Sequence, residues 1–317
     1  MALESWTVTE ETRLAAEVKR ALDLSHRKAQ GLIDRGAVKV GGSVVTDHGT
    51  KLAPGDAIEV RTDAPRATAA GGKASGQKSG RGGKKEPPAL AEILFEDRHL
   101  LVIAKPSGVL TIPGENQRSL PLNRRDPNLE DWLRARDLAR GATPSIFIVQ
   151  RLDRGTSGVL LFPRSRYAAD LLKPAFAKHT IERRYRAIVV GSPPPEGTLT
   201  HRLIEKRGRV IEAHPTEPGA KEAITHFKTL ESRNGLARLE LRLETGRRNQ
   251  IRVGCSLSGF PILGDRTYGE PSPAIERPAL HAHSLGFSHP HSGEPMQFTM
   301  DEPADFQSAW ASSSAGE

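Results

Sequence analysis

The sequence contains very little cysteine. Cys255 is the single cysteine among 317 residues, so no disulfide can form within the chain and no zinc site can be built from several cysteines. Such sparing use of cysteine fits a reducing compartment, and we expect a cytoplasmic location. Cys255 itself falls within an expected helix, where we interpret it as a small core residue.

Long apolar stretches are also missing. No segment approaches the roughly 20 apolar residues that span a bilayer as a helix, so we expect no membrane partner. Residues Met1–Trp6 lack a basic region followed by an apolar stretch. We therefore expect no signal peptide.

Positive charge is what the sequence has in excess. Its 46 Lys and Arg residues against 38 Asp and Glu give a formal net charge of +8. This balance favours a polyanionic partner, most simply nucleic acid. Hydrophobic residues make up 37%, so most of the chain should fold around a core, as one large domain or two unequal ones.

Residues 1–64 indicate a small α/β module. Thr9 is placed to cap a helix whose apolar residues recur every four positions over 14–22. Ser25 is placed to cap a second helix, and Gly36 to end it.

A hairpin and a last strand should follow these two helices. Apolar residues flank Gly41-Gly42 over residues 38–45, and Pro54-Gly55-Asp56 predicts a turn into a strand over 57–60. This order resembles the small RNA-binding domain first known from a ribosomal small-subunit protein, the S-four domain. The resemblance rests on Ser25-His26-Arg27 and on the motif-like segment 32–42, although that family usually has Asn where Gly41 stands.

The resemblance implies a basic surface that contacts RNA phosphates. The residues that match are Arg27, Lys28, Arg35 and Lys39. The alternative is a generic helix-hairpin module with a solvated basic face.

Residues 65–88 change in composition and predict a flexible basic linker. They are rich in Ala, Gly, Ser and Lys, with almost nothing apolar to offset the entropy of ordering. The glycines and lysines do not form a phosphate-binding loop, because no Gly-Lys-Ser/Thr triplet closes one and no strand precedes it. At the other end of the chain, we expect residues 311–317 to be a disordered tail.

Residues 89–310 should form one large unit. Its first half predicts a hairpin over 93–103, a turn at Lys105-Pro106-Ser107-Gly108, and helices over 131–139 and 167–177. The path of the polar residues 113–145 is otherwise not evident from the sequence.

The second half of this unit is dominated by strands. We expect strands over 183–191, 227–231 and 236–243, with Asn234-Gly235 as a hairpin turn between the last two, and a helix over 250–258. Alternation in the first strand places Tyr185, Ala187 and Val189 on one face. The predicted fold class is therefore α+β with a mixed, mainly antiparallel central sheet.

The segment Gln150–Phe162 combines charge with a buried strand. Asp153 lies between Arg151 and Arg154, and a short apolar run follows the turn Gly155–Gly158. A carboxylate at the mouth of a buried strand is costly to desolvate unless cations lie beside it. These residues alone are explained by a structural ion pair at a strand end.

Other segments of the large unit change that interpretation. They are Tyr185 on its strand, Thr245–Val253, and Gly259–Gly269. Together with Arg151-Leu152-Asp153, Glu96-Asp97 and Lys105-Pro106-Ser107-Gly108, they resemble the RluA-type family of RNA pseudouridine synthases. Leu280-His281-Ala282 and the later His289-Pro290 are similar to a further segment of that family, and the match covers roughly residues 92–303 in order.

The resemblance implies the pseudouridine synthase fold and the isomerisation of uridine in RNA without a cofactor. Glycoside hydrolysis usually needs two carboxylates, but isomerisation activates no water, so a single one can suffice. Asp153 matches the family's catalytic Asp, as a nucleophile or as a base that removes a ribose proton. Arg252 matches an arginine expected to pair with Asp153 and keep it ionised and aimed. Tyr185 matches a tyrosine that packs against the base and moves a proton late in the reaction.

The substrate contacts also follow from the resemblance. The uridine must be flipped into the site, and Arg151 is expected to fill the gap that it leaves. Other expected contacts are Thr156, Arg247, Gln150 and Asn249. The family commonly has His at the last two positions; Gln and Asn keep hydrogen-bonding capacity, so we expect activity to survive, with altered rate or substrate choice.

The sequence leaves three alternatives from other classes. Gly155-Thr156-Ser157-Gly158 is not the Gly-x-Ser-x-Gly turn of a serine hydrolase. The histidines between His281 and His291 are interpreted as surface or structural residues and no metal is expected, because no convergent carboxylates accompany them. An RNA-binding protein that keeps the fold without catalysis is supported only by Gln150 and Asn249.

The RNA target follows least directly from the sequence. Relatives with this layout act mainly on large-subunit ribosomal RNA, which is the expected partner, with transfer RNA as the alternative. We expect the protein to be a monomer. Individual uridines cannot be derived, because recognition uses shape, flipped bases and phosphate contacts.

Overall fold

The computed structural model describes residues 3–34, 36–61 and 86–312. The chain divides into two compact units, within residues 1–80 and 81–317, and each is described by itself. The division falls inside the predicted linker 65–88. Most of that linker, the tail from residue 313 and the predicted RNA contact Arg35 lie outside the described residues, so these assignments stay predictions.

The first unit packs two helices against a small antiparallel sheet. The sheet has the order β1-β6-β3-β4, formed by Leu3–Thr7, Ala57–Arg61, Val38–Val40 and Ser43–Val44. The helices are α1 (Leu14–Ala21) and α2 (His26–Asp34). Leu14, Val18, Ile33, Ile58 and Val60 are fully buried between them.

The start of α1 corrects the prediction that Thr9 caps this helix. The residues before the helix instead form the short strand β2 (Thr12–Arg13), which pairs with β5 (Lys51–Leu52), and the helix begins at Leu14. The first helical N–H groups need no side-chain cap, because Leu14 donates to the carbonyl of Thr50 at 2.9 Å and Ala15 to that of His48 at 3.2 Å. The segment 48–52, which is distant in sequence, thus determines where the helix starts.

The rest of this unit follows the predicted order. Ser25 Oγ accepts from the N–H of Lys28 at 3.3 Å, so it caps α2 as expected. Gly36 has φ +68° and donates to the carbonyl of Ile33, which ends the helix. The predicted hairpin and last strand are confirmed as β3-β4 and β6. The strand β1 was not predicted, because its partner β6 is distant in sequence.

The second unit is built on one ten-stranded sheet. Its order is β12-β11-β13-β14-β10-β15-β9-β8-β7, with β16 paired to β15. Only β15 and β9 are parallel among the pairs of the described strands. The α+β class with a mixed, mainly antiparallel sheet is therefore confirmed. The strands are β7 (Glu92–Glu96), β8 (Leu100–Lys105), β9 (Ser157–Pro163), β10 (Glu182–Val190), β11 (Glu196–Lys206), β12 (Arg209–Glu212), β13 (Lys221–Arg233), β14 (Leu236–Leu243), β15 (Leu280–Ser288) and β16 (Pro295–Thr299).

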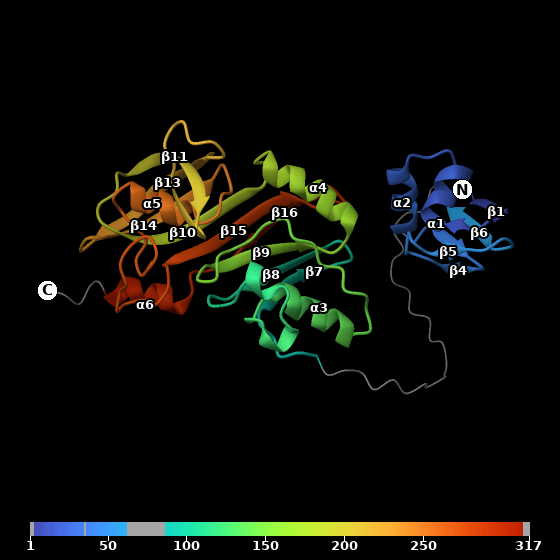
Figure 1. Ribbon diagram of the computed structural model, residues 1–317, viewed down its shortest axis with the longest axis horizontal. Coiled ribbons are helices and arrows are strands. Elements are labelled where there is room, and N and C mark those ends of the chain that lie inside the picture. The colour runs from blue at the N-terminus through green and yellow to red at the C-terminus, as the bar shows by residue number, and fades with distance from the viewer. Residues whose placement is uncertain (1–2, 35, 62–85, 313–317) are drawn as a thin grey trace. The chain divides into compact units, whose positions relative to one another are not determined.

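Helices cover both faces of the β8-β9 part of this sheet (Figure 1). They are α3 (Leu129–Ala139) on one face and α4 (Arg166–Ala177) on the other, while α5 (Gln250–Leu257) and α6 (Ala304–Ser312) pack farther along. Successive residues of β8 serve opposite cores, since Leu101 packs with Trp132 of α3 and Leu100 packs with Leu172 of α4. Two short 3₁₀ turns, Glu115–Gln117 and Leu122–Arg124, lie in the polar segment before α3.

Several expected elements of this unit are confirmed. The hairpin β13-β14 turns at Asn234 (φ +48°) and Gly235 (φ +74°), the left-handed pair that a two-residue turn requires. β13 is longer than expected, because it continues as the partner of β11 to Lys221. Cys255 is fully buried in α5, as expected of a core residue. No helix in residues 3–34, 36–61 or 86–312 is long and apolar enough to cross a membrane.

Candidate active site

Asp153 lies in a loop that is anchored immediately before β9. The N–H of Thr156 donates to the carbonyl of Asp153 at 3.1 Å, which closes the turn. The hydroxyl of Thr111 donates to the carbonyl of Leu152 at 2.9 Å and accepts from its N–H at 3.1 Å. Leu152 itself is buried in the main core. The residue before Asp153 is therefore held from two sides.

Lys105 supports the same loop from below. It is buried at the end of β8, and its ammonium donates to the carbonyls of Thr156 (2.8 Å), Pro106 (3.0 Å) and Arg154 (3.3 Å). Burial lowers the pKa of Lys105 to about 7, against a smaller opposing effect of the Asp153 charge. The Lys-Pro-x-Gly segment thus positions the loop and is more than the turn that the sequence suggested.

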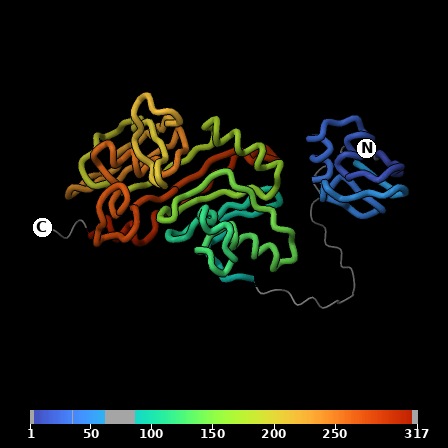
Figure 2. The backbone as a smooth tube through the Cα atoms, in the orientation of Figure 1, coloured from blue at the N-terminus to red at the C-terminus, as the bar shows by residue number. Residues whose placement is uncertain are grey.

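Close backbone packing fixes the exit from the loop into β9. Gly158 has φ +123°, and a Cβ atom there would overlap the backbone of Ala282 on β15. Only glycine lets the two backbones come this close. The close approach allows β9 and β15 to pair in parallel, and the two strands are the neighbouring green and red tubes in Figure 2. Ser157 Oγ lies 2.9 Å from Nδ1 of His281 on β15. The predicted Thr-Ser-Gly turn therefore joins the loop to the sheet centre.

The charge partner of Asp153 is Arg252 of α5. Arg252 Nη1 lies 3.4 Å from Asp153 Oδ2, as the resemblance implied. Neighbouring Arg154 instead extends to Asp126 at 3.3 Å and to the carbonyl of Gly108. The ion pair expected from local sequence alone is therefore wrong, and the distant one is confirmed.

Asp265 is a second carboxylate on Arg252 that the sequence did not assign. It is fully buried and binds the guanidinium through both oxygens, to Nε and Nη2 at 2.7 Å each. Burial acts to lower the pKa of Arg252, but the hydrogen bonds and charge of Asp265, with Asp153, raise it overall. Bidentate binding by Asp265 leaves Nη1 as the atom that faces Asp153. The one sequence feature that could have identified Asp265 is its position within the Gly259–Gly269 segment.

Asn249 holds Asp153 from a further direction. With its amide oriented to satisfy its neighbours, its NH₂ group donates to Asp153 Oδ2 at 2.9 Å and Oδ1 at 3.0 Å. Its oxygen then accepts from the hydroxyl of Tyr268 at 3.0 Å. Asn249 has φ +51° at the start of α5, a left-handed conformation that Asn tolerates better than most residues. The departure from His at this position thus keeps a hydrogen bond to the carboxylate.

Tyr185 and Arg183 form the opposite part of the site on β10. Both side chains are buried, and because the two residues are two positions apart in the strand, they lie on the same face. Burial raises the pKa of Tyr185 to about 12, so its phenol carries a proton at neutral pH. Arg183 was not among the predicted site residues, because the sequence shows only one of several arginines in its strand.

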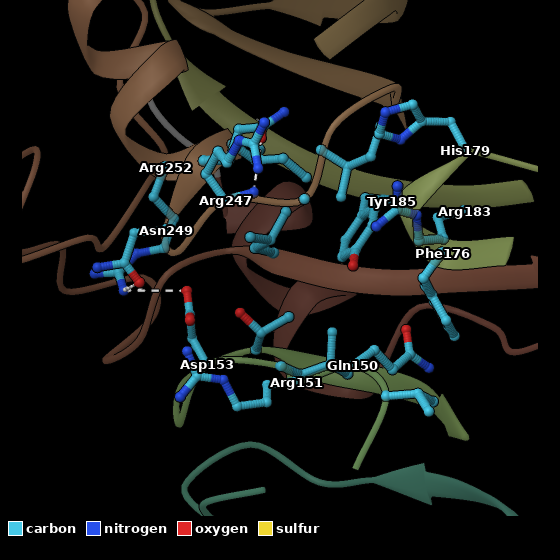
Figure 3. A pocket seen from close by; sticks show the side chains of 18 of the residues that line it. Gln150, Arg151, Asp153, Phe176, His179, Arg183, Tyr185, Arg247, Asn249 and Arg252 are labelled. Atoms are coloured by element: carbon cyan, nitrogen blue, oxygen red, sulfur yellow. Dashed lines mark hydrogen bonds and ion pairs between the residues drawn. The ribbon is translucent and has the colours of Figure 1, made fainter. Parts of the chain in front are cut away.

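These residues surround one cavity of about 420 Å³, a volume typical of a small-molecule site. Figure 3 shows Asp153 with Asn249 and Arg252 at one end, and Tyr185, Arg183 and Phe176 at the other. Cations and one carboxylate dominate its polar lining. The predicted site residues that line it are Gln150, Arg151, Asp153, Thr156, Tyr185, Arg247, Asn249 and Arg252.

The remaining predicted RNA contacts are in the first unit. Arg27 and Lys28 are exposed on α2, and Lys39 is half-buried on β3. Their role in RNA binding stays a prediction.

The histidines near the C-terminus make structural contacts. His281 bonds Ser157, and Nε2 of His289 lies 2.9 Å from Asp97 Oδ2. Burial lowers the pKa of His281 to about 4, so it is neutral at pH 7. Within the described part of the chain, no group of three or more His, Cys, Asp or Glu side chains is arranged to hold a metal ion.

The site combines a half-exposed, pre-oriented carboxylate with an adjoining cavity lined by cations. The side chain of Asp153 is 30% exposed, so it is accessible to a ligand while Arg252 and Asn249 fix its direction. A carboxylate held in this way can attack an electrophilic carbon or remove a proton. The cationic lining suits a polyanionic substrate.

Comparison with known proteins identifies the family. A family model described as RNA pseudouridylate synthase matches residues 99–257, and the S-four domain model matches residues 12–58. The chain is 34% identical over 325 residues to ribosomal large subunit pseudouridine synthase D of Zymomonas mobilis, covering 97% of this chain and 96% of that protein. It is 35% identical over 223 residues to an uncharacterised RNA pseudouridine synthase of Bacillus subtilis, covering 68% and 70% of the two chains.

The fold of the large unit is also similar to that of a solved pseudouridylate synthase. The solved structure of human RNA pseudouridylate synthase domain containing 4 matches with a TM-score of 0.57 and 22% identity, over 69% of this chain and 92% of that chain. This likeness shows that the large unit has the pseudouridine synthase fold. The chain therefore belongs to the RluA-type family of RNA pseudouridine synthases, which are isomerases, and it carries an S-four domain in its N-terminal part.

Proposed function

We propose that this protein isomerises uridines of large-subunit ribosomal RNA, and that Asp153 performs the bond chemistry. The observation that carries the assignment is that Arg252 forms an ion pair with the Asp153 carboxylate at the edge of the cavity, and that Asn249 donates hydrogen bonds to it. The RNA target is supported by the relative from Zymomonas mobilis, whose name specifies the large ribosomal subunit and whose similarity extends over nearly the whole chain.

The target base reaches Asp153 only if it leaves the RNA stack. A nucleotide inside a duplex cannot enter a cavity of this kind, so the uridine is flipped out and inserted. Arg151 is exposed at the cavity beside Asp153, where it can occupy the gap in the RNA. Exposed Arg247 and Lys173 line the cavity too, where they bind the backbone phosphates that flank the flipped nucleotide.

The reaction then rearranges one bond without consuming water. Asp153 either attacks C1′ of the ribose or removes the C2′ proton, and in both routes the C1′–N1 bond breaks with its electron pair moving to uracil. The base turns and C5 joins C1′. In the first route the bond between Asp153 and C1′ breaks at this step, and in the second route Asp153 returns its proton to C2′. The C5 proton is then lost while N1 gains one. Tyr185 packs against the ring during this turn and takes part in the late proton transfer. Product and substrate are isomers, so atoms and charge balance.

The catalytic reading is favoured over an RNA-binding protein that keeps the fold. Only Gln150 and Asn249, where the family commonly has His, favour a loss of activity. Asn249, however, keeps two hydrogen bonds to the Asp153 carboxylate, and Gln150 lines the same cavity. An RNA substrate made in the cytoplasm implies that the protein acts there, and its monomeric state stays a prediction.

Mapping of pseudouridine tests the proposal. Purified protein is incubated with unmodified large-subunit ribosomal RNA, and with transfer RNA in a parallel reaction. We expect new pseudouridine at one or a few positions of the ribosomal RNA and none in transfer RNA. The reverse pattern would transfer the assignment to transfer RNA, and tight binding of both RNAs without any pseudouridine would support the binding protein instead.

A further inference from the structure

Arg183 is a buried cation that forms no ion pair with the residues that the structure describes. Its side chain extends from β10 into the cavity, the residue is 7% exposed, and its Nε and Nη2 atoms are buried without a hydrogen-bond partner among the described residues. Arg186 on the same strand pairs with Glu240 at 3.1 Å, and Arg252 across the cavity pairs with two carboxylates. Arg183 therefore differs from the arginines around it.

The surroundings of Arg183 accommodate the guanidinium but do not neutralise it. Its central carbon lies 5.7 Å from the ring centre of Phe176. A Cβ atom at Gly246 would come within 2.7 Å of its Nη1 atom, so the absent side chain there makes room. Burial lowers the pKa of Arg183, yet arginine keeps its charge at any ordinary pH. An isolated buried ion therefore destabilises the fold.

We propose that Arg183 is a catalytic residue that donates hydrogen bonds to the carbonyl oxygens of uracil while the base is detached from the ribose. This inference rests on the proposed function. When the C1′–N1 bond breaks, its electron pair stays with uracil, and the negative charge spreads over N1, O2 and O4. Attack at C1′ and removal of the C2′ proton both produce this anion, so the role of Arg183 is the same in either route for Asp153.

The position of Arg183 fits the base better than a phosphate. Arg183 lies beside Tyr185, the expected packing surface for uracil, and at the end of the cavity away from Asp153 (Figure 3). The exposed cations Lys173, Arg151 and Arg247 line the same cavity where solvent reaches it and suit hydrated phosphates. A pre-oriented donor in a site without water stabilises developing charge far more than one in solvent.

The first test compares Arg183→Met with a matched neighbour. Met keeps the length and apolar packing of the side chain but removes charge and donors. We expect kcat for pseudouridine formation to fall about 10²–10³-fold, as for loss of one anion-stabilising donor, with KM for RNA within about twofold. The melting temperature should stay equal or rise, because an unpaired buried charge is removed. Arg183→Lys should recover part of kcat.

Arg184→Met is the control for general effects of losing an arginine from β10. Arg184 is exposed and pairs with Glu182 and with Glu240, the latter at 3.2 Å. We expect its kcat and KM to stay within about twofold of those of the unaltered protein.

The second test changes the leaving group. Fluorine at C5 stabilises the uracil anion, so cleavage of a 5-fluorouridine in the same RNA should depend less on Arg183. In single turnovers, measured as loss of the intact nucleoside, we expect the deficit of Arg183→Met to shrink at least about tenfold relative to uridine.

Three results would overturn the inference. An increase of KM with unchanged kcat, and a slope of log affinity against log salt reduced by about 0.7, would make Arg183 a phosphate contact. A lowered melting temperature with equal deficits for both nucleosides would make its role structural. Activity equal to that of Arg184→Met would make it dispensable. If the unaltered protein itself forms no pseudouridine, the proposed function fails, and this role for Arg183 fails with it.

Discussion

The two ends of the cavity differ in how far the protein satisfies its own polar groups. At one end, Asp153 is held by Arg252 and Asn249. At the other end, Arg183 has two buried guanidinium nitrogens and Gln150 a buried amide nitrogen without partners among the described residues. The first end is therefore held by the protein's own groups, whereas the second end retains donors that, in our proposal, the base accepts from.

The same difference separates contributions to stability from contributions to catalysis. Removing one partner of a buried ion pair lowers the free energy of unfolding by several kcal/mol, because the other charge is left unpaired. Removing a buried ion that is already unpaired leaves the free energy of unfolding unchanged or raises it. Variants of the first end should therefore lose both stability and activity. Variants of the second end should lose activity alone.

Asp265→Asn should have the largest effect on stability among the variants of the first end. The amide places N–H groups against the guanidinium of Arg252 where Asp265 now accepts two bonds of 2.7 Å, so Arg252 turns away from Asp153. We expect a loss of about 3–5 kcal/mol in the free energy of unfolding and a fall in kcat of about 10²-fold. Near-UV circular dichroism in denaturant and single-turnover kinetics measure the two effects.

Asp305→Asn is the matched control for that variant. Asp305 also binds an arginine through both oxygens, to Arg277 at 2.6 and 2.8 Å, but it is exposed. Its loss should change stability by less than about 1 kcal/mol and leave kcat unchanged. Equal destabilisation by both variants would contradict the special role of the buried pair.

Asn249→Ala should have a smaller effect. It removes two hydrogen bonds to Asp153 but leaves Arg252 in place, so we expect kcat to fall roughly 10-fold, which equals about 1.4 kcal/mol, with KM unchanged. Tyr268→Phe removes only the hydroxyl that orients the amide and should lose less. Asn249→His should retain activity and add an inflection to the pH profile, because imidazole titrates near neutral pH. A rise in KM alone would show that Asn249 binds RNA rather than positions the carboxylate.

Lys105 offers an effect on stability that is spread over several pH units, and a comparison with Arg183. It is a buried cation whose partners are carbonyls, and burial lowers its pKa to about 7 from 10.5. Between these two pH values the unfolded chain binds a proton that the folded chain has lost, so raising the pH favours folding. Relative to Lys105→Met, the unaltered protein should gain stability from pH 7 to about 10, by at most about 1.4 kcal/mol per pH unit. A difference that stays flat in denaturant titrations over this range would show that Lys105 keeps its proton.

The sequence predicted the elements that local patterns determine. Asn234-Gly235 indicated its hairpin, and the apolar run after Asp153 indicated β9, because turn chemistry and alternation are local. The start of α1 was mispredicted, since Thr9 has the right chemistry for a cap but carbonyls of Thr50 and His48 supply the partners. Contacts with a segment distant in sequence therefore outweighed the local capping preference of Thr9.

The site was predictable only where a motif marked it. The pair of Asp153 with Arg252 was expected from the resemblance and is present. Asp265 lay within a recognised segment without a role, because its burial and its bidentate geometry appear only in the folded chain. Arg183 carried no signal at all, since its lack of an ion pair with the described residues is a property of the fold around it.

The division of the cavity is tested most directly by Asp153→Asn in a single measurement that follows RNA binding and pseudouridine formation together. Asparagine keeps the shape of the side chain but cannot attack C1′ or accept the C2′ proton. We predict that the variant binds the ribosomal RNA target within about threefold of the unaltered protein while isomerisation falls by about 10⁴-fold or more. Pseudouridine formed at an undiminished rate would contradict the assignment of the bond chemistry to Asp153.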